Sequence, residues 1–360
     1  MAGPAPERWT LPDLSALIDP PFDTIIDARS PAEFAQDRLP GAINLPVLDD
    51  GERARVGTIY KQDSPFRARR IGAALVSRNI ARHLDGPLAD RPGRWHPLIY
   101  CWRGGQRSGA LAAVLAQVGW RVAVLDGGYR SFRRAVVAML YERPLPVPVI
   151  VLAGGTGTAK TAVLRAVAAA GGAAIDLEGL ANHRGSAFGA RPGGQPAQKG
   201  FESAIAMALA GPPAAAPLLV EDESARIGTL RLPPSLWAAM RTAPRIALRA
   251  GAASRARYLA RDYADIAADR AGFSAMLDRL VPLHGRARVA DWQGLAAQGA
   301  TEALAADLIA RHYDPAYGRL RGPTPAAEVT VPDEALDAGA FETVAQAVLA
   351  EMKRLRGGTA

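Results

Sequence analysis

Apolar residues recur along the first part of the chain in the order expected of alternating strands and helices. Residues 24–27 and 96–101 are short apolar runs that predict buried strands. A glycine-rich turn follows the second run and leads into a stretch with helical apolar spacing, and residues 122–128 predict another strand. Alternating strands and helices predict an α/β fold with a mostly parallel sheet, whose active sites gather at the carboxyl ends of its strands.

The same alternation begins again in the second part of the chain. Between the two parts lies RPLPVP, residues 143–148, which we interpret as a semi-rigid proline-rich linker. Residues 149–155 predict a buried strand, the glycine-rich stretch after them predicts a loop that opens into a helix, and residues 173–179 and 216–224 predict two further strands. From about Pro233 onward, runs rich in Ala and Arg predict helices.

The length of the chain agrees with this division. Its 360 residues exceed one comfortable hydrophobic core, so we expect two domains. The predicted boundaries give an α/β domain at 1–142, the linker at 143–148, a second α/β domain at 149–315, and a C-terminal helical segment with a tail at 316–360. Hydrophobic residues make up 49% and charged residues 22%, which is typical of folded chains.

The net charge of +8 favours a polyanionic partner, because basic side chains release counterions when they bind nucleic acid. The alternative is compositional bias, since nearly every basic residue is Arg. Lys stands only at positions 61, 160, 199 and 353. For contacts with an RNA backbone, the arginine clusters of the predicted helices are the candidates, and a solvated basic face is the competing interpretation. They are Arg67, Arg69, Arg70, Arg255, Arg257 and Arg261.

The cellular location is predicted from what the sequence lacks. It has no run of about 18 apolar residues and no secretory pattern at its start, so we expect a cytoplasmic protein without a membrane span. Cys101 is the single cysteine, which excludes an intramolecular disulfide and a cysteine-built zinc site, and which fits a reducing compartment.

Cys101 ends a predicted strand and is followed by a glycine-rich turn and a helix. Backbone N–H groups at such a helix start stabilise a thiolate, and Arg103 and Arg107 add positive charge nearby. We therefore expect an exposed nucleophile with a lowered pKa; the alternative is a small buried residue. Trp102 has two interpretations, one that it stacks on an extruded RNA base and the other that it covers the loop.

A second glycine-rich turn, GGTGTAKT, follows a buried strand and precedes a helix, as a P-loop requires. Its residues are Gly154, Gly155, Thr156, Gly157, Thr158, Ala159, Lys160 and Thr161. Backbone N–H groups would surround phosphate oxygens, Lys160 would neutralise them, and Thr161 is placed to ligate Mg²⁺. Ala159 departs from the pattern, because a P-loop normally has Gly before the Lys, and this departure counts against ordinary ATP turnover.

Polar residues also follow the neighbouring predicted strands. Glu221 and Asp222, with Glu223 after them, are candidates for an acid or metal role, with a solvated loop as the alternative. Asn182, His183 and Arg184 follow another predicted strand. They are candidates for contact with a diphosphate or tRNA, and a surface polar loop is the competing interpretation.

Three segments of the first domain resemble the rhodanese domain. They are IIDARSPAEF, LPGAINLPV and YCWRGGQRSG, at residues 25–34, 39–47 and 100–109. The resemblance implies that Cys101 carries sulfur or selenium, and that Asp27 and Arg29 lie near the active-site loop. It also implies an active-site cradle formed by Trp102, Arg103, Gly104, Gly105, Gln106 and Arg107. Without a second cysteine, the chalcogen must pass directly to an external acceptor, which indicates a transferase.

A rhodanese-like domain followed by a P-loop α/β domain resembles the tRNA 2-selenouridine synthase family. Further segments extend the likeness over nearly the whole chain, at residues 47–76, 125–134, 175–189, 220–228 and 312–317. The resemblance implies that a wobble 2-thiouridine of tRNA is first S-geranylated with geranyl diphosphate and then converted to 2-selenouridine with selenophosphate. It implies no prosthetic group, and a selenophosphate-supplying enzyme as a further partner.

Two rival functions remain open from the residues alone. One is a rhodanese-type sulfurtransferase with a regulatory P-loop domain, which would need no tRNA. The other is an ATP-dependent kinase or switch, which would be indifferent to loss of Cys101 and is disfavoured by Ala159. The site of a geranyl chain is also open: Phe188, Phe201 and Met207 are apolar candidates, although apolar residues at helical spacing usually form core.

Overall fold

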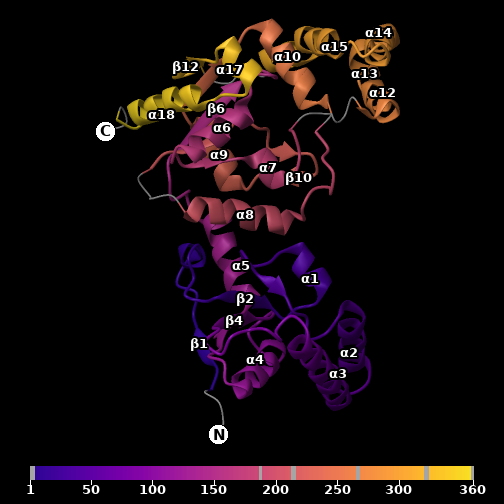
Figure 1. The fold of residues 1–360 in the computed structure, drawn as a ribbon, viewed down its shortest axis with the longest axis vertical. Helices are drawn as coiled ribbons and strands as arrows, with labels where there is room; N and C mark the ends of the chain where they lie inside the picture. Colours follow the sequence, from indigo (N-terminus) through magenta and orange to yellow (C-terminus); the bar gives the residue numbers. More distant parts are fainter. Residues whose placement is uncertain (1–4, 186–188, 212–215, 265–267, 320–323, 358–360) are drawn as a thin grey trace. The chain divides into compact units, whose positions relative to one another are not determined.

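The computed structural model describes residues 5–185, 189–211, 216–264, 268–319 and 324–357. The chain forms two compact units (Figure 1). The N-terminal unit comprises Met1–Pro146, Gln195–Gly211 and Leu230–Ser235, and the C-terminal unit comprises Val147–Gly194, Pro212–Thr229 and Leu236–Ala360.

A five-stranded parallel sheet forms the centre of the N-terminal unit, with the strand order β1-β5-β4-β2-β3. The strands are β1 (Glu7–Trp9), β2 (Thr24–Asp27), β3 (Ile43–Asn44), β4 (Pro97–Tyr100) and β5 (Ala123–Leu125). Asp27 lies opposite Tyr100 in the register of β2 and β4, so the ends of both strands meet at one edge. The parallel α/β sheet expected from the apolar pattern is confirmed here.

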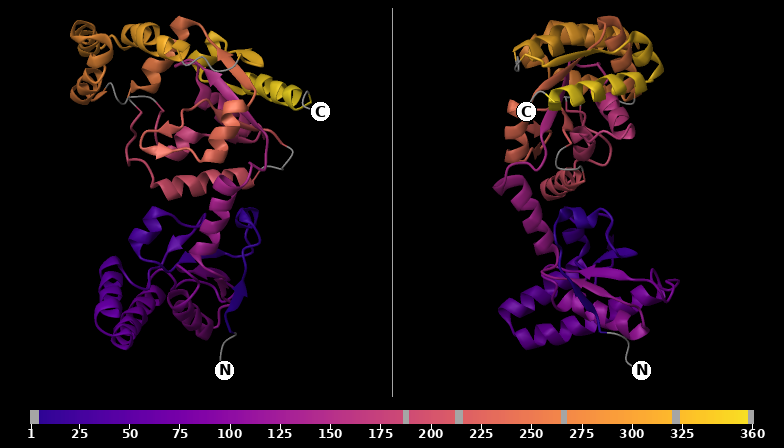
Figure 2. Two further views of the ribbon diagram at one scale, coloured as in Figure 1. Left: turned by 180° about the vertical axis from the view of Figure 1, so that it is seen from behind. Right: turned by 90° about the vertical axis from the view of Figure 1, so that its left-hand side faces the viewer.

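The helices of this unit are set by clear local signals. They are η1 (Leu14–Leu17), α1 (Pro31–Gln36), α2 (Asp50–Gln62), α3 (Pro65–Asp85), α4 (Gln106–Val118), α5 (Tyr129–Val137) and the π-helix η2 (Ala138–Glu142). Asp49 and Glu52 form a capping box at the start of α2, and Ser64 caps α3. Figure 2 shows α2 and α3 side by side as a helical pair.

One helix of the N-terminal unit comes from a later part of the sequence. It is α8 (Gln198–Ala210), and the short strand β10 (Leu230–Arg231) belongs to the same unit. The Ser203 hydroxyl donates to the Asp37 carboxylate at 2.8 Å, and Arg133 pairs with Glu202. Asp37, Ser203 and Glu202 are buried, so α8 is part of the core of this unit. The apolar pattern along the chain gave no sign of this placement.

A second five-stranded parallel sheet forms the C-terminal unit, with the order β12-β11-β6-β8-β7. The strands are β6 (Val149–Gly154), β7 (Ala174–Ile175), β8 (Leu218–Glu221), β11 (Arg245–Arg249) and β12 (Ala327–Thr330), and the short β9 (Arg226–Ile227) lies outside this sheet. The segment expected to be a C-terminal helical tail therefore also contributes a strand. Val329 of β12 is buried in the core of the sheet.

Helices cover this sheet and extend beyond it as a separate cluster. Those near the sheet are α6 (Lys160–Ala169), α7 (Leu177–Ala181), α9 (Pro234–Thr242), α17 (Asp333–Ala338) and α18 (Glu342–Gly357). The remaining helices are α10 (Ala252–Asp262), α12 (Arg270–Asp278), α13 (Val281–His284), α14 (Arg286–Ala297), α15 (Thr301–Leu308), η3 (Ile309–Tyr313) and α16 (Asp314–Arg319). Figure 1 shows these helices in orange, and the cluster has a core of its own that includes Trp292. Within the described residues, no helix combines the length and apolarity needed to cross a membrane.

Candidate functional site

Cys101 lies at the carboxyl end of the central strand β4, and α4 begins five residues later at Gln106. The loop between them needs glycine at one position in particular. Gly104 has a φ of +66°, and a methyl group added there would lie 2.5 Å from the Leu125 carbonyl oxygen. The Tyr129 N–H donates to the Cys101 carbonyl at 2.8 Å, which ties the loop to the start of α5.

Cys101 is 3% exposed, so the prediction that it is an exposed residue is wrong. Cys101 belongs to the same buried core as Leu111 and Ala112 of α4. The Ser108 hydroxyl donates to Sγ at 3.2 Å. The expected direction of the pKa change does hold. Burial raises the pKa of the thiol, but hydrogen bonds from Ser108 and from the backbone N–H groups of Arg103 and Gly105 outweigh it and lower that pKa below its ordinary value.

The arginines beside the cysteine act differently from the expectation. Arg107 forms an ion pair with Glu33 at 2.7 Å, and Glu33 also pairs with Arg53 at 2.9 Å. Much of the charge of Arg107 is therefore balanced by a carboxylate. Arg103 and Gln106 are exposed. The thiolate is therefore stabilised by the hydrogen bonds at the helix start rather than by the side-chain charges of Arg103 and Arg107.

Asp27 and Arg29 form a buried ion pair beneath the loop. The Arg29 guanidinium donates to the Asp27 carboxylate at 2.6 Å and to the Asp37 carbonyl at 2.6 Å. It also lies over the Tyr129 ring, 4.1 Å from the ring centre. Because Tyr129 bonds to the Cys101 backbone, the pair supports the loop through an intermediate ring rather than through the thiol.

Trp102 is 36% exposed and stands beside the thiol loop. Its ring centre lies 5.3 Å from that of Tyr129, with 33° between the planes. The Tyr129 hydroxyl in turn donates to the buried Asp37 carboxylate at 2.7 Å. The partly exposed indole of Trp102 is therefore held in place by Tyr129, which is itself anchored to Asp37. Both interpretations of Trp102, base stacking and loop cover, stay predictions.

The second glycine-rich turn connects β6 to α6, which begins at Lys160. Gly157 has a φ of +84°, and a methyl group there would lie 2.6 Å from the Arg255 carbonyl oxygen. Ala159, with a φ of +60°, adopts the left-handed conformation that glycine adopts more readily, at a cost of roughly 1–2 kcal/mol. Ala159 is buried in the same core as Val163, and the burial of its methyl group offsets part of this strain. At position 159 the loop therefore has the left-handed backbone conformation that favours glycine, although the residue is Ala.

Lys160 and Thr161 contact the protein's own oxygens in this structure. The Lys160 ammonium donates to the Gly154 carbonyl at 2.8 Å. The Thr161 hydroxyl lies 3.1 Å from a Glu178 carboxylate oxygen and 3.3 Å from a Glu221 oxygen. The ammonium and hydroxyl expected to meet phosphate thus stand together at the start of α6.

Three glutamates surround this point, and Glu178 is the one that the sequence analysis missed. It lies on α7 and reaches Glu221 of β8, whose carboxylate accepts its backbone N–H at 2.6 Å. Burial and the nearby Glu178 charge raise the pKa of Glu221 to about 8. The same two causes raise the pKa of Glu223 to about 8. Glu178 lies within residues 173–179, which were predicted to be a strand, but β7 ends at Ile175 and Glu178 lies in the first turn of α7.

Asp222 does not join these glutamates. Its carboxylate pairs with Arg245 at 2.6 Å, and its backbone N–H donates to the Leu152 carbonyl. Across the described parts of the chain, no group of three or more His, Cys, Asp or Glu is arranged to hold a metal ion. The joint acid or metal role expected of Glu221 and Asp222 is therefore not supported by their placement, because the two side chains have different partners.

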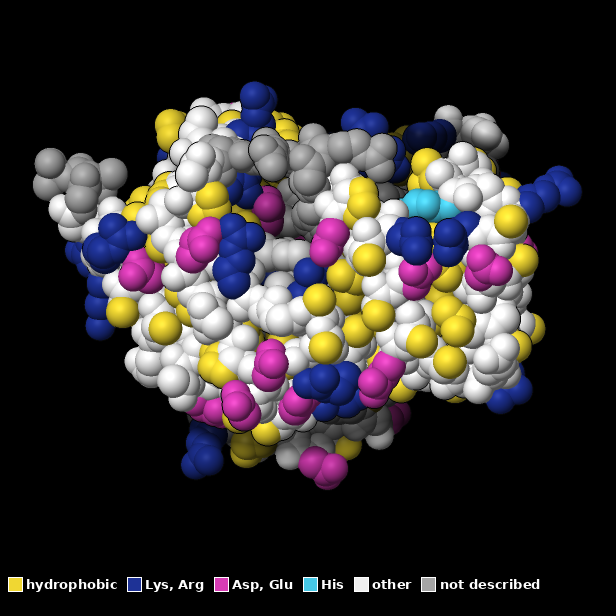
Figure 3. Space-filling view, turned by 90° about the horizontal axis from the view of Figure 1, so that it is seen from above, with side chains coloured by type: hydrophobic (Ala, Val, Ile, Leu, Met, Phe, Trp, Pro, Cys, Tyr) yellow, Lys and Arg dark blue, Asp and Glu magenta, His cyan; other side chains and the backbone are white. Residues whose placement is uncertain are grey.

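A cavity of about 540 Å³ opens beside the phosphate loop, large enough for a small organic ligand. Five basic side chains line it: Lys160, Arg165, Arg184, Arg191 and Arg245. Within the described residues, the buried Nε of Arg245 has no hydrogen-bond partner. Figure 3 shows a face on which basic and acidic side chains are interspersed. The carboxylates Glu178, Asp222, Glu223 and Asp262 also line the cavity, and Asp222 pairs with Arg245, so the cavity offers several cations to an anionic ligand among carboxylates of the protein itself.

The three polar residues after β7 have different positions. The Asn182 amide donates to the carbonyls of Pro192 and Gly194 at 2.9 and 2.8 Å, so it holds the neighbouring loop. His183 bridges to Ala190 through the backbone. Arg184 lines the cavity, with its guanidinium 5.2 Å from the centre of the Tyr263 ring. Of the three, Arg184 is the one placed to meet a ligand there.

The arginines of α10 hold groups of the protein itself. Arg255 donates to the Thr156 carbonyl at 2.8 Å and pairs with Asp314 at 2.7 Å, so it supports the phosphate loop. Arg257 pairs with Asp337, and Arg261 donates to backbone carbonyls at the end of α17. The expectation that the α10 arginines bind tRNA stays a prediction. The α3 arginines Arg67, Arg69 and Arg70 are exposed, although Arg67 pairs with Asp63 at 2.6 Å and Arg69 donates to the Pro65 carbonyl at 3.2 Å.

Fold and sites together define a class of protein: a thiol-bearing rhodanese-type domain joined to a P-loop-type α/β domain. Family models agree with both halves. The rhodanese-like domain model matches residues 10–135, and the model described as the tRNA 2-selenouridine synthase AAA domain matches residues 147–280.

Curated relatives identify the family. A tRNA 2-selenouridine synthase of Chromohalobacter salexigens is 37% identical over 86% of this chain and 91% of its own length. Proteins of the same name from Alcanivorax borkumensis and Pseudomonas syringae pv. syringae are 40% and 32% identical, over 66% and 82% of this chain and 66% and 88% of their own lengths. The chain belongs to the tRNA 2-selenouridine synthase family, which confirms the predicted family, the fold class and the assignment as a transferase.

Proposed function

We propose that this chain converts the wobble 2-thiouridine of tRNA to 2-selenouridine in two steps, with geranyl diphosphate and then selenophosphate as cosubstrates. The observation that carries the proposal is the presence of two dissimilar sites in one chain. One is a thiol of lowered pKa in a rhodanese-type unit, and the other is a cavity beside a phosphate loop, lined by Lys160 and four arginines. The relatives are named tRNA 2-selenouridine synthases, which supports tRNA as the substrate and selenium as the element transferred.

We assign the first step, geranylation, to the phosphate loop. The thiouridine sulfur attacks the first carbon of the geranyl group, a C–S bond forms, and the C–O bond breaks as diphosphate leaves with its electron pair. Lys160 and the loop N–H groups would stabilise the leaving diphosphate. This step requires no hydrolysis of a third phosphate, so the departure at Ala159 from the usual P-loop is tolerated.

Mg²⁺ enters the proposal as a companion of the diphosphate. Since the described residues contain no preformed cluster of metal ligands, we propose that the ion arrives bound to the diphosphate oxygens rather than being held by the chain beforehand. The proposal includes no prosthetic group.

We assign the second step, exchange of sulfur for selenium, to Cys101. The thiolate attacks the phosphorus of selenophosphate, an S–P bond forms, and the P–Se bond breaks with its electron pair leaving on selenium. The selenide released then attacks C2 of the geranylated uridine, a C–Se bond forms, and geranyl thiolate departs. Water cleaves the S–P bond and releases phosphate and the free thiol. No atom changes its oxidation state in this sequence, so the single cysteine suffices.

For tRNA we propose a contact surface at the α2–α3 tip, defined as Tyr60, Phe66, Arg67, Arg69 and Arg70. Tyr60 and Phe66 are 55% and 73% exposed, unusual values for aromatic side chains in a folded unit. Exposed rings beside arginines suit RNA, because unpaired bases stack on the rings while the cations contact phosphates. We place the reaction in the cytoplasm, beside an enzyme that supplies selenophosphate.

This surface is tested by the salt dependence of tRNA binding. Replacing both Arg69 and Arg70 by Ala is expected to reduce the slope of log affinity against log salt by roughly one unit for each lost phosphate contact. Arg94→Ala is the matched control, since Arg94 is also exposed but precedes β4, at the opposite end of the strand from Cys101. Equal slopes in the wild type and the double variant would exclude the α2–α3 tip.

The reaction is tested by mass spectrometry of nucleosides from 2-thiouridine tRNA incubated with both cosubstrates. The wild type should yield 2-selenouridine, Cys101→Ala should stop at the geranylated base, and Lys160→Ala should leave 2-thiouridine unchanged. Formation of 2-selenouridine by Cys101→Ala would refute the role of the thiol. Wild-type sulfur transfer from thiosulfate to a small thiol, with no change in the tRNA, would favour the sulfurtransferase instead.

A further inference from the structure

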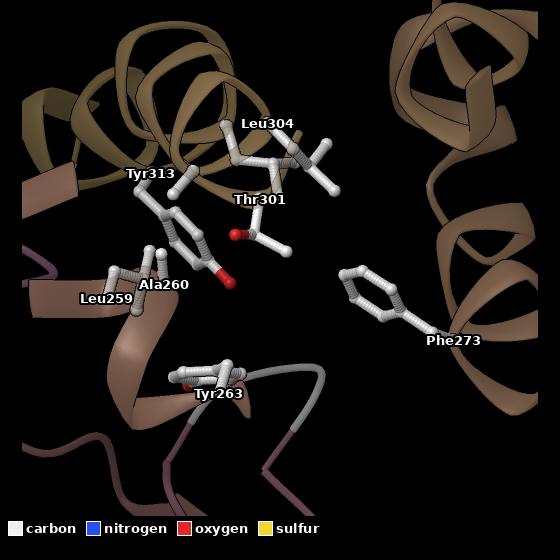
Figure 4. A pocket seen from close by; sticks show the side chains of 9 residues that line it. Leu259, Ala260, Tyr263, Phe273, Thr301, Leu304 and Tyr313 are labelled. Carbon is white, nitrogen blue, oxygen red and sulfur yellow. The ribbon is translucent and has the colours of Figure 1, made fainter. Parts of the chain in front are cut away.

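A small apolar pocket adjoins the phosphate cavity in the C-terminal unit. It is formed by α10, α12, α15 and η3, and its lining residues are Leu259, Ala260, Tyr263, Phe273, Thr301, Leu304, Ala305, Leu308 and Tyr313. Figure 4 shows the rings of Tyr263 and Tyr313 on one side of the space and the ring of Phe273 on the other, with Thr301 and Leu304 between them. The pocket thus presents hydrocarbon and ring surfaces from separate helices.

The pocket and the phosphate cavity share part of their walls. Leu259, Tyr263 and Tyr313 line both of them. Helix α10 also connects them directly, since Arg255 on the same helix donates to the Thr156 carbonyl of the phosphate loop. With a rise of 1.5 Å per helical residue, Leu259 and Tyr263 lie roughly 6 and 12 Å further along the axis than Arg255. A ligand anchored at the loop would reach the pocket with a short chain.

The residues that line the pocket indicate which kind of ligand it binds. A nucleotide base would place several donors and acceptors among Leu304, Ala305 and Leu308, where unmatched polar groups carry a desolvation cost. A hydrocarbon chain has no such groups, and it gains from leaving water. The volume of the pocket is about 30 Å³, so it takes the end of a chain rather than a whole ligand.

We propose that this pocket binds the far end of the hydrocarbon chain of a prenyl diphosphate whose diphosphate lies at residues 154–161. The proposal rests on the proposed function, which supplies geranyl diphosphate as the cosubstrate, and it adds the site that selects the chain. Phe201 and Met207, considered for this role from the sequence, lie on α8 in the N-terminal unit and line neither space. Phe188 lies outside the described residues.

The test measures binding without tRNA, by titration calorimetry with inorganic diphosphate, dimethylallyl diphosphate and geranyl diphosphate. The wild type should bind geranyl diphosphate about tenfold or more tightly than either of the others, because only the longer chain reaches the pocket. Its heat-capacity change on binding should be the most negative of the three, since that change reports buried apolar surface. Equal affinities for geranyl diphosphate and inorganic diphosphate would overturn the proposal.

Two variants locate the effect in the pocket. Thr301→Phe fills the space from the first turn of α15, and it should remove the preference for geranyl diphosphate while leaving inorganic diphosphate affinity unchanged. Ala303→Phe is the matched control, because Ala303 is exposed on the same helix, and it should keep the preference. An undiminished preference in Thr301→Phe would overturn the proposal.

A third variant covers the case in which Thr301→Phe also loses inorganic diphosphate binding and is misfolded. Leu304→Ala removes lining contacts instead of filling the pocket, and it should weaken geranyl diphosphate several-fold with unchanged inorganic diphosphate affinity. Unchanged geranyl diphosphate affinity in Leu304→Ala would then overturn the proposal. The reaction on tRNA is followed separately by nucleoside analysis, so failure of the pocket and failure of the proposed function are distinguishable.

Discussion

The thiol loop and the phosphate loop lie at the same kind of place, the carboxyl end of a central parallel strand followed by a helix. They differ in how they stabilise negative charge. Around Cys101 the donors are backbone N–H groups and one hydroxyl, all from residues 101–108. Around Lys160 the charged groups come from separate segments, among them Glu178, Arg184 and Arg245.

We call the Cys101 site local, because its donors come from one short segment, and the Lys160 site assembled, because its charged groups come from separate segments. A local site stabilises one small charge in a buried position, with little dependence on the rest of the unit. An assembled site can hold a larger anion and adjust its own charge, because its glutamates have pKa values near the physiological range. The predictions below test this contrast, beginning with the largest expected effect.

Removal of the ammonium should affect the assembled site most strongly. Lys160→Ala is expected to weaken inorganic diphosphate binding roughly 100-fold, because a charge-assisted contact to phosphate is lost inside the cavity. Calorimetric titration measures this directly. Lys353→Ala, at an exposed position on α18, should bind like the wild type. A loss of less than about twofold in Lys160→Ala would mean that the loop N–H groups hold the anion without it.

The glutamates should make the stability of the chain depend on pH. The pKa of Glu221 is about 8 in the folded chain, above its ordinary value of 4.5. Between these values the folded chain keeps a proton that the unfolded chain releases, so the free energy of unfolding falls as pH rises from about 5 to about 8. Glu221→Gln should lessen this fall by an amount on the order of a few kcal/mol.

Denaturant unfolding at a series of pH values measures this change. Glu334→Gln is the matched control, because Glu334 is exposed on α17, and it should follow the wild type. An unchanged pH dependence in Glu221→Gln would show that this carboxyl group does not keep its proton in the folded chain.

The local site should show the smallest effect. Ser108→Ala removes the hydroxyl that donates to Cys101 Sγ, and it should raise the pKa of the thiol while the backbone donors remain. The ultraviolet absorbance of the thiolate, titrated against a Cys101→Ala blank, measures this in a chain with one cysteine. Ser77→Ala, exposed on α3, should leave the titration unchanged. A thiol that titrates identically with and without the Ser108 hydroxyl would contradict the account.

The same contrast explains what the sequence could predict. The direction of the Cys101 pKa change followed from adjacent residues, because a strand, a glycine turn and a helix start are all visible in one segment. The burial of the thiol did not, since it depends on how α4 packs against the sheet. The arginines beside it were expected to act directly, but Arg107 pairs with Glu33, which is distant in sequence.

The assembled site was predictable only in part. Its loop was recognised from spacing, whereas the role of Glu178 and the support from Arg255 depend on segments that fold together. Asp222 looked equivalent to Glu221, yet alternation along a strand sends neighbouring side chains to opposite faces, where Asp222 meets Arg245. The strand β12 was missed for a similar reason, because its four residues gain a partner only when β11 lies beside them.

The central claim is that the two sites perform separate steps, and a relay of defective variants tests it most directly. 2-Thiouridine tRNA is first treated with Cys101→Ala and geranyl diphosphate, purified, and then given to Lys160→Ala with selenophosphate. The account predicts 2-selenouridine after the second incubation, because each variant keeps the site that the other lacks. A tRNA that remains geranylated would contradict the separation of the steps and would mean that both sites are needed together.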